Sequence, residues 1–249
     1  VCFTGIKPGS QEKECIATLK LTEVDEVSRA THLVAGGKGV PLRRTPKLLV
    51  GMSLCRHIVD VEWLHKSAKE GKVLEGDDFT LRDKQAEEKW GFSMPESLAA
   101  ARAHHEGRTG GGGGPLAGFG VHVDPSVVAR TDLGCPPAVE MKALVESAGG
   151  AWLSRLPTTI TTSGGGGGGC KAKKPKGKAG AAASAAAAAD EHLLVISHPK
   201  ALSATGGGLA AAGRAGKAYL PEFLFLAALR QELRWDAALE AGGGGGSSG

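Results

Sequence analysis

Hydrophobic residues in the first third of the chain form short apolar runs that alternate with segments of helical character. The apolar runs are typical of strands buried in a sheet, and they cover residues 1–4, 31–35 and 57–61. The helical segments have apolar residues at helical spacing or clear helix ends, and they cover residues 10–20, 45–54 and 62–70. The order β, α, β, α, β, α, with room for one optional strand between the first helix and the second apolar run, predicts a parallel sheet with helices on its faces.

A similar order of elements returns in the second half of the chain. A connecting helix is expected first, over residues 87–105, followed by a flexible break at the glycines 110–114. Beyond the break, strands are expected at residues 120–123, 151–156 and 192–197, and helices at 138–148 and 220–233. We therefore expect two similar α/β units, the second interrupted by a long loop.

These patterns divide the chain into four parts. We expect a first unit at 1–88, a linker helix with a Gly-rich break at 89–114, a second unit at 115–241 and a disordered tail at 242–249. The second unit contains an insertion at 163–189 made of Gly, Lys and Ala. This insertion lacks the apolar residues that offset the entropy of ordering, so we expect it to be disordered. Because Val1 already lies in a predicted strand, we expect the chain to be a fragment of a longer protein.

Composition and charge limit the classes of function that we expect for this chain. The chain has 249 residues and 39 glycines, and much of the glycine excess lies in three homopolymer runs. The net charge is only +4, and five lysines fall within residues 171–178, so a broad surface for nucleic acid is not expected. That lysine run suits a nuclear import signal, a non-specific nucleic-acid contact or a solvated linker. No apolar run reaches membrane-spanning length.

Cysteine and histidine spacing predicts no metal site. The five cysteines are widely separated, which indicates a reducing compartment without a disulfide framework. Cys2 and Cys55 lie on predicted core segments, and Trp63 is expected in the core as well. No cofactor is expected, because the glycine-rich segments 36–39 and 206–211 match nucleotide-binding loops poorly.

Two features of the first unit point to an anion site. Thr4 and Gly5 end the first strand and offer a hydroxyl group and an approachable backbone N–H. Arg43, Arg44 and Lys47 crowd the start of the second helix, where a partly positive helix end disfavours cations unless an anion is bound. Strand ends and helix starts share one side of a parallel α/β unit, so Thr4 and Lys47 can meet around a phosphate. Solvated side chains beside a loop are the alternative reading.

Sequence segments around these residues resemble the BRCT family, and in particular tandem BRCT repeats of DNA damage response proteins. The resemblance rests first on Phe3-Thr4-Gly5, on Arg44-Thr45-Pro46-Lys47 and on the segment 61–64. It continues at residues 90–94, 221–224 and 229–232, so it covers nearly the whole chain apart from the homopolymer runs. It implies an α/β fold of two BRCT repeats, each a small parallel sheet flanked by helices, packed as a tandem.

The resemblance also implies roles for individual residues. Phosphoserine would be bound by Thr4, Gly5 and Lys47, with Thr45 supporting the phosphate site. Arg44 would contact peptide groups beyond the phosphate, such as the free C-terminal carboxylate of a phosphorylated histone tail. The second repeat shows Val121-His122-Val123 where a phosphate site needs Ser/Thr-Gly. We therefore expect it to bind no phosphate and to complete the peptide groove.

The resemblance thus implies a non-enzymatic, nuclear phosphopeptide-binding module of a DNA damage response mediator or scaffold. Its expected partner is a phosphorylated protein or histone tail, with neither membrane nor direct nucleic-acid binding. One alternative is a BRCT scaffold that binds protein or nucleic acid without phosphate. A more remote one is a nucleotide-binding α/β enzyme. The sequence does not identify the phosphoprotein.

Overall fold

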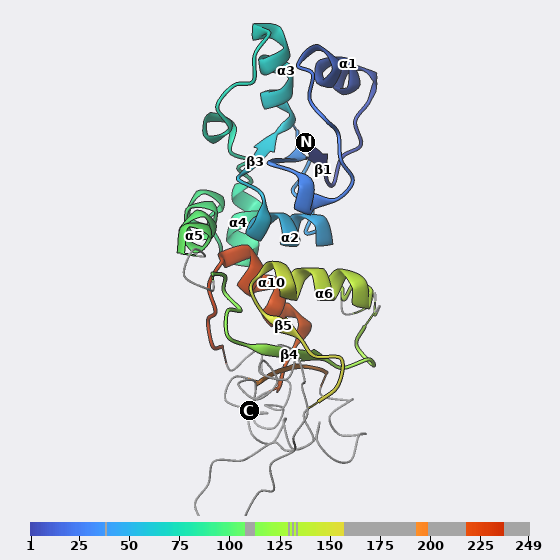
Figure 1. Cartoon of the computed structure of the whole chain (residues 1–249), viewed down its shortest axis with the longest axis vertical. Coiled ribbons are helices and arrows are strands. Elements are labelled where there is room, and N and C mark those ends of the chain that lie inside the picture. Colours follow the sequence, from blue (N-terminus) through green and yellow to red (C-terminus); the bar gives the residue numbers. More distant parts are fainter. Residues whose placement is uncertain are drawn as a thin grey trace, which may run out of the picture.

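The chain forms an elongated molecule with a small sheet toward each end and a layer of helices between them (Figure 1). In this computed structural model, the described residues are 1–37, 39–107, 113–128, 130, 132, 134–156, 193–198 and 218–236. The expected insertion at 163–189, with its lysine run, lies outside these residues, as do the segment 206–211 and the tail at 242–249. The proposed part boundaries therefore stay predictions.

The first sheet contains three parallel strands in the order β1-β2-β3. They are β1 (Cys2–Phe3), β2 (His32–Gly36) and β3 (His57–Asp60). The helices of this unit are α1 (Ser10–Thr18), α2 (Pro46–Leu54) and α3 (Val61–Glu70), with 3-10 turns η1 (Val27–Arg29) and η2 (Gly76–Phe79). The alternation of parallel strands and helices is confirmed, and the bounds differ from the expected ones by one or two residues.

The second sheet contains four parallel strands in the order β5-β4-β6-β7. They are β4 (Gly120–Val123), β5 (Ala151–Trp152), β6 (Leu193–Ile196) and β7 (Ala218–Tyr219). Its described helices are α6 (Ala138–Ser147) and α10 (Pro221–Arg230). The strand expected over 151–156 is shorter than predicted, and the two-residue strand β7 was not predicted.

The connecting segment is two helices, so the expectation of one helix over 87–105 is wrong. They are α4 (Lys84–Trp90) and α5 (Met94–Gly107). Gly91 ends α4 in the left-handed conformation, with φ +59°. The N–H of Phe92 then donates to the carbonyl of Glu87 at 3.0 Å, which closes the helix end in a Schellman-type turn.

Helices from both units form the layer between the sheets. Helix α2 packs against α6 and α10, and Leu48 and Met52 on α2 are fully buried there. The side-chain amide of Gln231 donates to the Ser53 hydroxyl at 2.9 Å across this layer. The predicted fold class, two small parallel sheets flanked by helices and packed as a tandem, is therefore confirmed.

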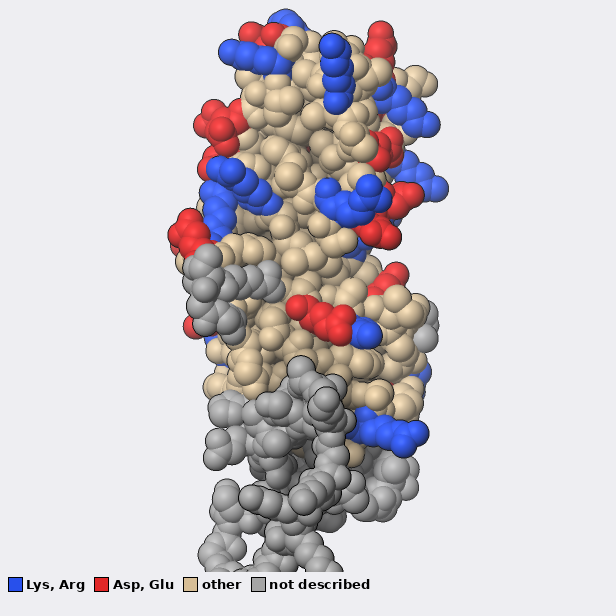
Figure 2. All heavy atoms as spheres, in the orientation of Figure 1, with Lys and Arg blue, Asp and Glu red and all other residues tan. Residues whose placement is uncertain are grey.

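The core positions predicted for the first unit are also confirmed. Trp63 is fully buried, and its indole N–H donates to the carbonyl of Leu74 at 2.9 Å. Cys2 and Cys55 are buried free thiols. On the face drawn in Figure 2, acidic and basic side chains of the first unit are interspersed. Within the described ranges, none of the helices combines the length and apolarity needed to cross a bilayer.

Candidate functional site

The end of β1 places Thr4 and Gly5 beside the start of α2. The N–H of Thr4 donates to the carbonyl of Val34 at 3.0 Å, so Thr4 extends the pairing of β1 with β2 and its side chain is buried. Gly5 has φ +73°, a backbone conformation that residues other than glycine rarely adopt. Gly5 is exposed, and its N–H has no hydrogen-bond acceptor among the residues that the structure describes. This N–H remains available to an acceptor from outside.

Thr45 caps the first turn of α2 and also contacts Thr4. Its hydroxyl accepts a hydrogen bond from the N–H of Leu48 at 3.1 Å, and Pro46 begins the helix. The hydroxyl oxygens of Thr4 and Thr45 lie 2.5 Å apart. A hydroxyl carries one proton, so when Thr45 donates to Thr4, the proton of Thr4 is free to point toward an anion. The sequence located this helix start, and the structure joins it to the end of β1.

Lys47, in the first turn of α2, is half-buried and makes no hydrogen bond or ion pair with any described residue. The charge of Lys47 acts on the thiol of Cys2, two residues before Thr4, which indicates that the ammonium group lies close to β1. Burial raises the pKa of the Cys2 thiol, and the charge of Lys47 partly offsets that rise. The first turn of α2 contains no acidic residue. A hydroxyl, an N–H, an ammonium group and a helix N-terminus therefore lie in one neighbourhood without an acidic group from that helix turn.

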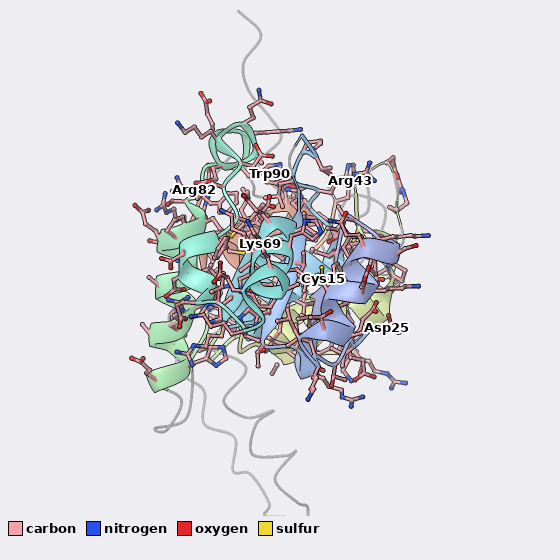
Figure 3. The ribbon with its side chains drawn as sticks, turned by 90° about the horizontal axis from the view of Figure 1, so that it is seen from above. Cys15, Asp25, Arg43, Lys69, Arg82 and Trp90 are labelled. Atoms are coloured by element: carbon pink, nitrogen blue, oxygen red, sulfur yellow. The ribbon has the colours of Figure 1, made fainter. Side chains whose placement is uncertain are left out.

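Arg44 is held at the contact between the two units. Its guanidinium bonds the Glu222 carboxylate on α10 at 2.5 Å and lies 5.1 Å from the ring centre of Phe225 and 5.6 Å from that of Trp90. The side chain is 21% exposed, so part of it still reaches the surface. Sequence reasoning missed Glu222 as a partner, because the two residues lie 178 positions apart. Figure 3 shows Arg43 and Trp90 toward one side of the molecule and Asp25 toward the opposite side.

Comparisons with known proteins identify the fold around this site. No protein-family model matches the chain. PAX-interacting protein 1 from Bos taurus is 36% identical over 163 residues, which is 64% of this chain and 14% of that protein. Mediator of DNA damage checkpoint protein 1 from Homo sapiens is 30% identical over 157 residues, which is 63% of this chain and 6% of that protein. The chain thus spans only a small part of either relative.

A solved structure matches at the level of the fold. The crystal structure of the Schizosaccharomyces pombe Brc1 BRCT5-BRCT6 domains superposes with a TM-score of 0.61 at 18% identity. The match covers 93% of this chain and 92% of that one. The chain has the fold of a tandem pair of BRCT repeats. In this pair, β1 to α3 belong to the first BRCT repeat, and β4 to α10 belong to the second.

The second BRCT repeat has a carboxylate where the first has Thr4. The N–H of Asp124 donates to the carbonyl of Ile196 at 2.8 Å, just as Thr4 donates to Val34 in the first repeat. Asp124 and Pro125 therefore correspond to Thr4 and Gly5, rather than the expected segment 121–123. The Asp124 carboxylate is buried and accepts bonds from the Ser197 hydroxyl at 2.8 Å and the Ser126 N–H at 2.9 Å. A buried carboxylate repels phosphate and proline has no N–H, so this position is unsuited to a second phosphate.

The first BRCT repeat also brings three potential metal ligands together, which sequence spacing did not predict. One ligand atom each from His57, Glu75 and Asp77 lies within 4.8 Å of the other two. However, the Arg102 guanidinium donates to Asp77, with one of its bonds at 3.1 Å, and holds the pKa of that carboxyl below its usual range. His57 and Asp77 also bond each other at 3.1 Å. We interpret this cluster as an ion-pair network between η2 and α5.

Proposed function

We propose that this BRCT pair is the phosphopeptide-binding module of a nuclear DNA damage response scaffold protein. Its partner is a phosphorylated protein, such as a histone tail, and the module binds its partner without catalysing a reaction. The names of two relatives, a PAX-interacting protein and a mediator of the DNA damage checkpoint, support a scaffold role in that response.

One observation carries the proposal: the two threonine hydroxyls that meet at 2.5 Å between the end of β1 and the start of α2. This contact brings Thr4 and the N–H of Gly5 to a helix N-terminus whose first turn contains Lys47. A phosphate monoester carries nearly two negative charges and three acceptor oxygens. The hydroxyl, the N–H and the ammonium group can each contact one oxygen. Charge-assisted bonds of this kind make phosphate the expected ligand rather than a neutral hydroxyl.

Arg44 extends the proposed site toward the second repeat. One guanidinium nitrogen bonds Glu222, and the other donors of the side chain stay available to a ligand. In the proposed complex, these donors contact peptide groups beyond the phosphate, including a free C-terminal carboxylate where the ligand ends in one. Glu222 competes for the same guanidinium, so we expect Arg44 to contribute less to affinity than Lys47.

The distribution of charge favours a peptide over a nucleic acid. On the face drawn in Figure 2, acidic side chains lie among the basic ones, and they interrupt any track that a phosphate backbone could follow. The candidate anion site is a local group of donors, which suits a single phosphate on a peptide.

Fluorescence anisotropy with a phosphoserine peptide tests the proposed function. We expect the phosphorylated peptide to bind and its unphosphorylated form to bind at least about tenfold more weakly, because charge-assisted bonds contribute about 1.5–3 kcal/mol. Lys47→Met should remove most of this difference, whereas Lys13→Met, at an exposed lysine on α1, should preserve it. Equal affinity for both peptide forms would contradict the proposal and favour a phosphate-independent scaffold. A C-terminally amidated peptide separates the contribution of a terminal carboxylate.

A further inference from the structure

A groove beside Lys47 runs along the contact between the two repeats. It has a volume of about 460 Å³ and lies between α2, α6 and the η1 turn. Its apolar lining comes from Val27, Val50, Leu54 and Ala143. Lys47 and Pro46 line the end of the groove that adjoins the proposed phosphate site. A ligand that extends from the phosphate along this contact therefore enters the groove.

Carboxylates dominate the charge of this groove. Its acidic lining residues are Asp25, Glu26, Glu140 and Glu146, and Lys47 is the one basic lining residue among those that the structure describes. The carboxylates of Asp25, Glu26 and Glu140 form no ion pair with any residue in the described part of the chain. Glu146 has one partner, Lys142, at 3.7 Å on the exposed surface of α6. If phosphate neutralises Lys47, the groove is left with a net negative charge.

Asp25 lies beside the start of β1, and on a different side of the molecule from Trp90. The backbone carbonyl of Asp25 accepts a weak hydrogen bond from the Cys2 thiol at 3.6 Å. The charge of Lys47 acts on the same thiol, where it partly offsets the rise in pKa that burial causes. Figure 3 places Arg43 and Trp90 toward one side and Asp25 toward the opposite side. Arg44 stacks on Trp90. The ligand flank that meets Arg44 and the flank that enters the groove therefore leave the phosphate in different directions.

We propose that the groove binds a basic segment of the ligand, rich in lysine or arginine, on the side of the phosphoresidue away from Arg44. This inference rests on the proposed function, in which Arg44 meets residues after the phosphate, so the basic segment comes before it. The apolar lining suits the aliphatic stems of lysine and arginine, and the rim carboxylates suit their charged ends. The module then selects a phosphoresidue preceded by positive charge.

Peptides with charge on one flank at a time test the inference. The first phosphoserine peptide has neutral flanks, the second has three lysines before the phosphoserine, and the third has three lysines after it. We expect the second to bind tighter than the first by about two- to five-fold for each ion pair formed. The third should gain less, and the gain of the second should shrink as salt is raised from 0.05 to 0.5 M.

Substitutions in the groove test whether its carboxylates cause the gain in affinity. The double substitution Asp25→Asn with Glu140→Gln should lower the affinity ratio of the second to the first peptide, because it removes two of the four groove carboxylates. Both residues are exposed, so the fold should persist, and thermal melting checks this. Glu70→Gln, at an exposed position at the end of α3, is the matched control and should keep the ratio.

Each failure has a separate meaning. A ratio unchanged by the double substitution, or a larger gain from lysines after the phosphoserine, overturns the inference and leaves phosphopeptide binding intact. Equal binding of the neutral-flank peptide and its unphosphorylated form overturns the proposed function itself. Self-association of the chain that disappears in the double variant, measured by sedimentation, makes the groove a contact between copies and contradicts the inference.

Discussion

The hydroxyl oxygens of Thr4 and Thr45 lie 2.5 Å apart, although the residues are 41 positions apart in the chain. Thr4 ends a strand and Thr45 caps a helix, so the contact joins the two backbone features that form an anion site in a parallel α/β unit. Thr45 also accepts the bond from Leu48 that fixes the first turn of α2. The helix cap and the proposed binding site therefore share one side chain.

Substitutions at the two threonines should separate stability from binding. Thr45→Val removes the helix cap and should lower the free energy of unfolding by about 1 kcal/mol, measured by urea denaturation. Thr4→Val keeps the shape and removes a hydroxyl that, among the described residues, contacts Thr45 alone. It should cost little stability but about tenfold or more in phosphopeptide affinity, the loss of one charge-assisted bond. Thr45→Ser, which retains the hydroxyl, should resemble the parent protein. A Thr4→Val variant with full affinity would exclude the hydroxyl from the site.

The contact between Arg44 and Glu222 should couple the two repeats. Arg44→Ala and Glu222→Ala should each lower the free energy of unfolding, and the double variant should lose less than the sum. We expect a coupling of about 0.5–1 kcal/mol, because the pair is partly exposed to solvent. Arg44→Ala should cost more than Glu222→Ala, since it also loses the stacking on Trp90 and Phe225. Urea denaturation of the four proteins measures the cycle, and additive losses would contradict an energetic link.

Asp124 should act on stability alone. Asp124→Ala leaves the buried Ser197 hydroxyl without its acceptor and removes a bond to the Ser126 N–H, so it should cost about 1–3 kcal/mol. Phosphopeptide affinity at a temperature where the variant is folded should stay unchanged, because Asp124 belongs neither to the proposed phosphate site nor to the lining of the acidic groove. A fall in affinity at full occupancy of the folded state would place a ligand contact at the end of β4.

His32 should make the protein less stable as the pH falls below neutral. It stacks between Trp63 and His57, with ring centres at 4.5 and 4.6 Å. Burial, together with the nearby charges of His57, the N-terminus and Arg56, lowers its pKa from 6.5 to about 4. The unfolded chain therefore binds a proton between these pH values that the folded chain does not, and stability falls as the pH drops from about 6.5 toward about 4. His57, whose pKa burial also lowers, adds to the same trend.

Thermal melting across this pH range checks the prediction. His32→Gln cannot take up the proton, so its melting temperature should depend less on pH between 6.5 and 4 than that of the parent protein. An equally steep dependence in the variant would assign the effect to other groups. Stability is the quantity to follow, because a phosphate group titrates near pH 6 and would confuse a binding measurement.

Local signals explain which parts of the fold were predictable. Thr45 and Pro46 determine the start of α2 through a cap and a fixed φ, and Gly71 determines the end of α3 through its left-handed conformation. The sequence therefore predicts both ends without knowledge of the rest of the chain. Gly91 carries the same kind of signal at the end of α4, but helical residues on both sides masked it in the sequence pattern. A two-residue strand such as β7 has no periodicity to detect.

At the site, the sequence could not predict contacts between residues that lie far apart in the chain. Thr4, Gly5, Thr45 and Lys47 could be grouped from helix and strand ends and from family resemblance. The ion pair between Arg44 and Glu222 could not be predicted in this way, because no local sequence signal links two residues on different repeats. The correspondence of Asp124 with Thr4 depends on strand pairing, and the sequence placed it a residue or more too early. The acidic groove unites η1, α2 and α6, which come together only in the folded tandem.

The amide resonance of Gly5 gives the most direct test of a phosphate site in the first repeat. Its N–H has no acceptor among the described residues and should donate to the ligand phosphate. In a heteronuclear NMR titration, a phosphoserine peptide should move the Gly5 amide proton strongly downfield, while the unphosphorylated peptide should leave it in place. Binding of the phosphorylated peptide with an unmoved Gly5 resonance would contradict the account, because the phosphate would then lie elsewhere.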